Sequence, residues 1–265
     1  MEKLMILLIG LCLSTNLLGQ PSNGKDRHQN REVIEASINA KKKKVQQQPN
    51  NLMLYLQIAE AYIKIKEYEQ ATDWFSKAQK VQPQNAQVYY RRGVAQYLSG
   101  EITWAEAADD LMTATKKDRE FHNPYIYLGR IYRLIGKPEL AEHFLNQGLK
   151  IKSNDAELLT ERAELYRSIN QADKAIDDLI RAISQDSDFA PAYATLAQFY
   201  LDKNDLKKAV DYADQALSIA IDFAPALKVR AHAFLRSNQA KKACIDIEKL
   251  RLSGENVDEF ETNCN

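Results

Sequence analysis

The chain repeats itself about every 34 residues from position 52 onward. The six units begin at Leu52, Ala86, His122, Ala156, Ala190 and Ala224. The second unit is two residues longer than the others. A fixed period of this length means that each unit is one small supersecondary element, which buries its apolar face against its neighbours. The repeat therefore predicts a stack of similar units rather than a domain built around one central core.

Small residues recur at two places of every unit. The eighth place holds Ala59, Gly93, Gly129, Ala163, Ala197 and Ala231. The twentieth place, counted after the insertion in the second unit, holds Ala71, Ala107, Ala141, Ala175, Ala209 and Ala243. Alanine or glycine at fixed places lets two helices approach closely, while larger residues between them fill the gaps. Each unit is therefore expected to be a helical hairpin.

Residues that favour turns and helix starts agree with this register. The turn between the two helices holds Gly100, Gly136, Asn170, Asn204 and Asn238, which suit the left-handed conformation that ends a helix. Four prolines stand at helix starts, where the missing N–H is not needed: Pro124, Pro138, Pro191 and Pro225.

The pattern resembles the tetratricopeptide repeat (TPR). In the first unit the signature reads Tyr55, Ile58-Ala59, Tyr62, Ala71, Phe75, Ala78 and Pro83. The resemblance implies an all-α fold, an α-solenoid in which helical hairpins form a right-handed superhelix with capping helices at both ends. The predicted units are 52–85, 86–121, 122–155, 156–189, 190–223 and 224–253.

The N-terminal segment predicts export. Residues Leu4–Leu13 form an apolar run, which is too short to span a bilayer but fits the apolar region of a signal peptide. Residues 1–19 are expected to be this signal peptide, with cleavage after Gly19. The mature protein would begin at Gln20, have no integral membrane span and be periplasmic or at the cell surface. A retained anchor and lipid attachment at Cys12 are the alternatives.

Two segments precede the repeats. Residues 20–30 contain no large apolar side chain and are expected to be a flexible linker. Residues 31–51 carry apolar residues at helical spacing and predict an amphipathic helix. Its Lys41–Lys44 run is either a solvated helix face or a contact for an anionic surface.

The C-terminal segment 254–265 predicts a short capping helix. Gly254 can end the preceding helix, and Asn256 with Glu259 resembles a capping box. Val257, Phe260 and Cys264 would share the face turned toward the last unit. A disulfide between Cys244 and Cys264 is plausible after export, and two free thiols are the alternative.

The sequence offers no support for catalysis or for a cofactor. The four histidines are not spaced as zinc ligands: His28, His122, His143 and His232. No nucleotide-binding glycine motif and no nucleophile elbow occurs. With 36 basic and 36 acidic residues the chain has no net charge, which disfavours nucleic acid as a partner. We therefore expect no metal, no cofactor and no enzymatic activity.

The resemblance to TPR proteins implies a concave groove lined by places two, five, nine, twelve and thirteen of each first helix. Carried onto this chain, the groove residues are Leu56, Tyr90, Val94, Tyr97, Ile126, Arg130, Arg133, Arg167, Lys228, His232 and Arg236. The first part is apolar and aromatic and the later part is basic, which fits an extended peptide with an apolar anchor and acidic residues. The alternative is that these residues are merely tolerated at the surface. Because exposed groove charges affect association more than stability, Arg130→Glu together with Arg133→Glu should weaken partner binding without unfolding the stack.

These features predict an exported bacterial TPR protein that acts as a non-catalytic scaffold for a protein or peptide partner. Two other functions stay open: a carbohydrate- or ligand-binding accessory protein of the cell envelope, and a self-associating structural module.

Overall fold

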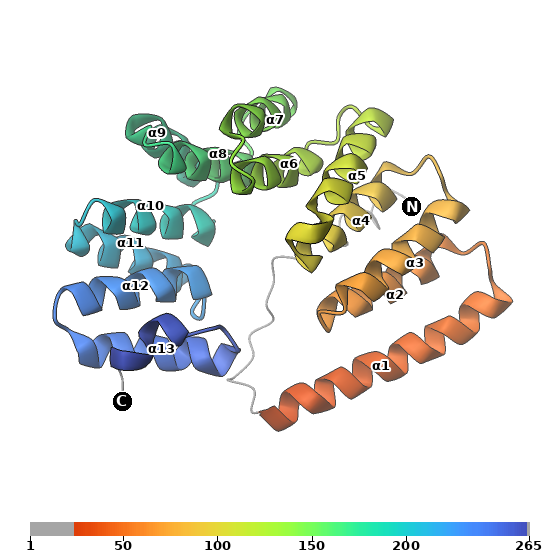
Figure 1. Cartoon of the computed structure of the whole chain (residues 1–265), viewed down its shortest axis with the longest axis horizontal. Helices are drawn as coiled ribbons and strands as arrows, with labels where there is room; N and C mark the ends of the chain where they lie inside the picture. The colour runs from red at the N-terminus through yellow and green to blue at the C-terminus, as the bar shows by residue number, and fades with distance from the viewer. Residues whose placement is uncertain (1–23, 264–265) are drawn as a thin grey trace.

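A computed structural model describes residues 24–263 of the chain (Figure 1). The α-helices are α1 (Gly24–Gln47), α2 (Leu52–Lys64), α3 (Tyr68–Val81), α4 (Ala86–Ser99), α5 (Trp104–Lys117), α6 (Asn123–Leu134), α7 (Pro138–Ile151), α8 (Ala156–Ser168), α9 (Ala172–Gln185), α10 (Ala190–Asp202), α11 (Leu206–Ile219), α12 (Ala224–Arg236) and α13 (Ala240–Ser253). Two 3₁₀ helices, η1 (Glu101–Thr103) and η2 (Asp258–Asn263), complete this part of the chain, in which no strand occurs. The predicted all-α class is confirmed.

Successive helices from α2 to α13 pair into six antiparallel hairpins that stack into an arc (Figure 1). First helices of neighbouring hairpins contact one another from α4 through α12. Each second helix packs most closely against the first helix of its own hairpin and also contacts the first helix of the next one. In Figure 1, α6 and α8 lie inside α7 and α9. The first helices α2, α4, α6, α8, α10 and α12 therefore form the inner face of an α-solenoid.

Left-handed residues close the hairpins at four of the five predicted turn positions, whereas Gly100 has φ 119° and ψ −175° and leads into η1. The asparagines at the turn have φ values between 57° and 59°: Asn170, Asn204 and Asn238. Gly136 has φ 72° at the same place of the third unit. The first unit uses Lys66 at φ 61°, a residue type that the pattern did not single out. The positive φ turns the chain back sharply, so the second helix lies beside the first.

Close approach of the paired helices depends on the small residues at place eight. A Cβ added at Gly129 would lie 2.4 Å from Cγ of Leu145, and one added at Gly93 would lie 2.9 Å from Cγ of Leu111. Both distances are below normal van der Waals contact, so an alanine at either position would require the facing leucine or its helix to shift. The place-twenty alanines are buried as well, which puts both small positions at the helix contact.

Buried ion pairs mark every second unit. Bidentate Arg–Asp pairs join places seven and twenty-three in the second, fourth and sixth units: Arg92–Asp110, Arg162–Asp178 and Arg230–Asp246. The aspartates are at most 7% exposed. Each arginine also donates from Nη1 to the second helix of the preceding unit, at Ser76, Asn146 or Asp214. These guanidinium groups therefore link an even-numbered unit to the odd-numbered unit before it.

The odd-numbered units hold apolar pairs at the same two places. These pairs are Ile58 with Trp74, Leu128 with Phe144, and Leu196 with Tyr212. The six units are consequently three modules, each an apolar unit followed by an ion-paired one. Single-unit alignment does not reveal this 68-residue period, which spans two repeats.

Helix α1 begins earlier than the sequence suggested. It starts at Gly24, so residues 24–30 of the expected linker are helical. Adding residues to an existing helix gains one hydrogen bond per residue without a new nucleation step, and no proline interrupts this segment. The helix ends at Gln47 rather than near residue 51, because Pro49 disfavours helical backbone in the residue before it.

The lysine run of α1 is divided between bound and exposed side chains. Lys41 donates to Ser37 at 2.5 Å, and Lys42 donates to the Tyr62 hydroxyl at 2.7 Å. Lys43 and Lys44 are exposed. The Lys41 bond lies within α1, whereas the Lys42 bond joins α1 to α2 and so helps to fasten the helix, which buries Ile38 against the first unit.

The C-terminal segment packs back on the last hairpin. Gly254 adopts the left-handed conformation after α13, and Val257 and Phe260 are buried in the last hydrophobic cluster. The element is the 3₁₀ helix η2 rather than an α-helix. Asn256 Oδ1 accepts from the N–H of Asp258, two residues on, so this contact is an Asx turn and does not reach the third residue as a capping box would.

Several predictions concern residues that lie outside the described part of the chain. These are the signal peptide with Cys12, the cleavage at Gln20, and Cys264 with its bridge to Cys244. Between residues 24 and 263, no helix is long and apolar enough to cross a membrane.

Candidate functional site

Three of the expected groove residues belong to the core. Leu56, Val94 and Ile126 are at most 9% exposed. Their side chains therefore belong to the packed interior of the stack. A bound peptide would meet the residues around them.

A row of five aromatic rings crosses the inner face at the second and third units. We call Phe121, Tyr90, Tyr127, Tyr97 and Trp104, in this spatial order, the aromatic row. The first three contacts are edge-to-face, with centroid distances of 5.0, 6.0 and 5.5 Å, and the last is stacked at 6.1 Å. All except Phe121 are partly exposed. Two expected groove residues, Tyr90 and Tyr97, thus lie in one continuous aromatic surface.

Arg130 lies over this row and joins it to the fourth unit. Its guanidinium carbon is 5.9 Å from the ring centre of Tyr97 and 5.2 Å from that of Tyr127. Its Nε donates to Oε1 of Glu161 at 3.0 Å. Burial opposes the positive charge, but the Glu161 carboxylate outweighs it and raises the pKa of Arg130. Arg133 lies near the same carboxylate, with Nη2 3.9 Å from Oε2.

The other expected basic groove residues also have partners within the chain. Arg167 contacts Asp202 at 2.5 Å, Lys228 contacts Glu255 at 2.9 Å, and His232 lies 3.4 Å from Glu259. Arg236 donates to the carbonyl of Leu201 at 2.9 Å. The expectation of a basic surface free to bind acidic residues is therefore corrected, because local carboxylates and a carbonyl take up these charges.

Sequence reasoning missed Tyr127, Glu157 and Glu161. Tyr127 and Glu161 occupy place six, which the expected groove did not include, and Glu157 occupies place two. Ion pairs Glu60–Arg91 and Arg130–Glu161 each join place nine of one unit to place six of the next. Opposite charges 31 residues apart were therefore the signal that could have shown place six to face the groove.

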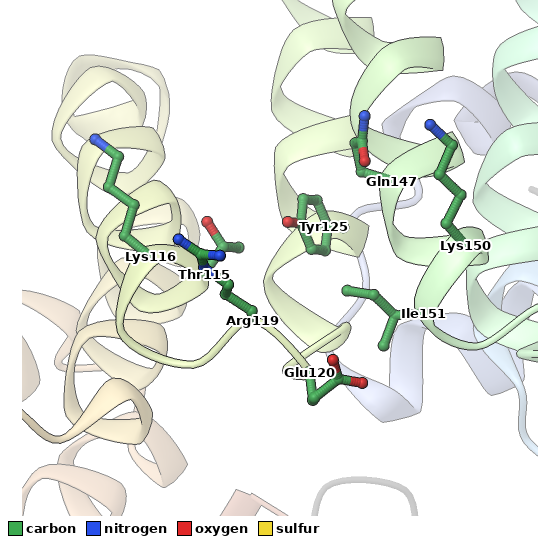
Figure 2. A pocket seen from close by; sticks show the side chains of 8 residues that line it. All are labelled: Thr115, Lys116, Arg119, Glu120, Tyr125, Gln147, Lys150 and Ile151. Atoms are coloured by element: carbon green, nitrogen blue, oxygen red, sulfur yellow. The ribbon is translucent and has the colours of Figure 1, made fainter.

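A separate hollow of about 530 Å³ lies between α5 and α7 (Figure 2). Arg119, Tyr125 and Gln147 line it together with Lys116 and Lys150. Both lysines lie in the last turn of their helices, where a cation stabilises the partial negative charge of the carbonyl end. The positions of these two lysines thus need no bound anion to explain them.

The described residues contain no group of three or more histidine, cysteine, aspartate or glutamate side chains placed to hold a metal ion. The chemistry of the inner face is that of aromatic contact, hydrogen bonding and charge pairing.

Comparisons with solved structures show the same fold at low sequence identity. A tetratricopeptide repeat protein from Parabacteroides merdae is 15% identical with a TM-score of 0.73, over 88% of this chain and 91% of that one. The type IV pilus biogenesis factor PilW is 18% identical with a TM-score of 0.62, over 80% and 97%. A chain of the APC/C hetero-tetramer Cut9–Hcn1 is 20% identical with a TM-score of 0.68, over 86% of this chain but only 44% of that one.

A search of curated proteins found no match to the sequence. The family model of the Cilia and flagella-associated protein 70 C-terminal domain matches residues 23–241, which is most of the chain and five of its six hairpins with much of the sixth. The protein therefore belongs to this family of tetratricopeptide repeat domains.

Proposed function

We propose that the protein is a non-catalytic scaffold that binds an extended segment of another protein along the inner face, with the aromatic row as the main contact. TPR-type families are generally scaffolds for protein partners. A neighbour of the same fold is part of the Cut9–Hcn1 hetero-tetramer, which supports a protein partner as the first candidate.

The observation that carries the proposal is the partly exposed aromatic row beneath Arg130. Tyrosine, tryptophan and arginine are the residue types most enriched at binding hot spots. Ring contacts hold Tyr97 and Tyr127 against their neighbours, so these side chains lose little conformational freedom when a partner binds. The rest of the inner face is largely neutralised by its own ion pairs, which makes the row its most available contact surface.

A selection from a library of random peptides tests the proposal. Peptides enriched on the full-length protein would be measured by fluorescence polarisation against the wild type, Tyr97→Ala and Tyr127→Ala. We expect each substitution to weaken binding by roughly tenfold or more, as for a hot-spot aromatic residue. Tyr212→Ala is the matched control, because Tyr212 makes a stacked ring contact on the second helix α11.

The control should leave affinity unchanged. Equal losses for Tyr212→Ala and the inner-face variants, or no loss for any of them, would contradict the proposal. Thermal melts followed by circular dichroism show whether each variant stays folded.

The carbohydrate-binding alternative predicts that ring faces are open for stacking against a sugar. Edge-to-face contacts and Arg130 already use much of the faces of Tyr97 and Tyr127. Measuring the affinity for sugars instead of peptides in the same binding assay would distinguish carbohydrate binding from peptide binding. Sedimentation of the protein alone would reveal the self-associating module, because that function requires assembly without any partner.

Export is part of the proposal, on the strength of the apolar run at residues 4–13. Protein purified from an exporting host should begin at Gln20, and a sequence that still begins at Met1 would contradict this. Thiol titration of the same non-reduced protein tests the bridge between Cys244 and Cys264. We expect no reactive thiol after denaturation, and two would show that the bridge does not form.

A further inference from the structure

Polar contacts between neighbouring units are concentrated inside the three modules. In each module the arginine at place seven of the ion-paired unit bonds to the second helix of the apolar unit before it. A basic residue of the ion-paired unit's second helix also contacts the loop that ends the preceding unit. These contacts are Lys117 to Gln84 at 2.8 Å, Arg181 to the carbonyl of Ser153 at 3.1 Å, and Lys249 to Asp222 at 3.7 Å. Each module is thus tied together on two sides.

The two junctions between modules lack these contacts. Place seven holds Leu128 in the third unit and Leu196 in the fifth, so no guanidinium group reaches back to the preceding unit. Among the described residues, Arg167 with Asp202 is the one side-chain hydrogen bond or ion pair that joins the fourth unit to the fifth. In the same part of the chain, no such contact joins the second unit to the third. The second junction of the stack is therefore its least tied point.

Apolar and aromatic contacts hold this junction on its inner side. The ring of Tyr127 in the third unit meets those of Tyr90 and Tyr97 in the second unit edge to face. Leu111 and Leu128 share one buried hydrophobic cluster across the same junction. Ring pairs are favourable over centroid distances of about 4.5 to 7 Å, whereas bidentate ion pairs demand one geometry. These contacts can therefore persist while the angle between the two units changes.

The outer side of the same junction is open. The hollow of about 530 Å³ lies here between α5 of the second unit and α7 of the third (Figure 2). Side chains of both helices line it, and no ion pair between described residues crosses it. A junction with flexible contacts on one side and free space on the other can bend without breaking a hydrogen bond.

We propose that the stack bends at the junction between the second and third units, with the rings around Tyr127 as the hinge. Residues 24–121 then move as one body against the units that follow. This inference goes beyond the proposed function, because the bending requires no partner. One consequence rests on the proposed function: a segment bound along the aromatic row would contact both sides of the hinge and hold it at one angle.

Distances between spin labels measure the bending in the full-length protein. Place 22 of the second helix is exposed in three successive units, as Asp109, His143 and Asp177. A ketone-bearing amino acid at two of these positions accepts a spin label and leaves the native cysteines unchanged. The pair 109 and 143 crosses the proposed hinge. The pair 143 and 177 is the matched control, because it crosses the tied junction inside the second module.

Without a partner, double electron–electron resonance should give a distance distribution that is roughly twice as broad or more for the hinge pair as for the control pair. Equal widths would overturn the inference. Tyr127→Ala removes two ring contacts of the hinge and should broaden the hinge pair further without changing the control pair. Tyr212→Ala, which removes a ring contact inside the fifth unit, should change neither. Circular dichroism melts confirm that each variant is folded.

The selected peptides separate the hinge from its coupling to binding. A saturating peptide that depends on Tyr97 should narrow the distribution of the hinge pair to that of the control pair. A peptide that binds in this way and leaves the distribution broad would overturn the coupling and leave both the hinge and the scaffold proposal standing. Failure to select any peptide that depends on the inner face would contradict the proposed function, while the measurement without a partner still decides the hinge.

Discussion

Removing Arg162 should destabilise the stack much more than its partial exposure suggests. Its Nε and Nη2 each lie 2.7 Å from Asp178, whose side chain is 4% exposed. Among the described residues, Arg162→Leu leaves this buried carboxylate with Arg181 as its remaining ion-pair partner, an exposed residue at 3.6 Å. Breaking a buried pair typically costs about 3 to 5 kcal/mol, and the residual partner places the expected loss near the lower end.

The apolar pair of the third unit shows which substitutions should compensate for the loss of Arg162. Leu128 and Phe144 occupy the places that Arg162 and Asp178 occupy in the fourth unit. The double variant Arg162→Leu with Asp178→Phe therefore copies a solution that this fold already uses. Because it removes the desolvated charge together with its partner, we expect its stability within about 1 kcal/mol of wild type.

Urea unfolding followed by circular dichroism measures both effects. Midpoint and slope should be reported together, because a repeat stack can unfold in parts. Arg181→Leu serves as the control and should change the free energy of unfolding by less than about 0.5 kcal/mol, since its side chain is half exposed. A loss below about 1 kcal/mol for Arg162→Leu, or a double variant no more stable than the single one, would refute the reasoning.

Three further predictions follow from the packing. The double variant Arg130→Glu with Arg133→Glu should lower the free energy of unfolding by about 2 kcal/mol or more, because it places two new carboxylates beside the buried carboxylate of Glu161. Urea titration measures this change, and unchanged stability would show instead that these arginines are exposed. Gly129→Ala should cost about 1 to 3 kcal/mol, since its Cβ would collide with Leu145, and an unchanged melting temperature would contradict that contact. Burial raises the pKa of Tyr166 to about 12, so its contribution to stability is present below pH 10 and is lost as the pH rises toward 12. Ultraviolet titration should show this phenol ionising after exposed tyrosines.

The repeat architecture could be predicted from sequence because close helix packing demands small residues at fixed places. Gly129 and the turn residue Asn170 illustrate this, since each satisfies a local steric requirement that few residue types can meet. The extent of α1 could not be predicted in this way. Its first turns extend an existing helix, and residues 24–30 lack the apolar spacing by which the rest of the helix was recognised.

The candidate site could be predicted only in part for a related reason. The position of a residue within the repeat predicts which way its side chain points, as it did for Tyr97. It does not predict whether a residue of a neighbouring unit forms an ion pair or hydrogen bond with that side chain. Arg130 was expected to be free and is bound to Glu161, 31 residues further along. Glu157 lies at an expected groove place, and only the three-dimensional arrangement shows that it has no direct partner.

Hydrogen exchange with and without a saturating selected peptide tests the central claim most directly. Amides of the inner helices around the aromatic row, in α4, α6 and α8, should become protected when the peptide binds, while α7 and α9 should not change. Protection limited to the outer helices, or none at an occupancy confirmed by polarisation, would contradict the account that the inner face is the binding surface.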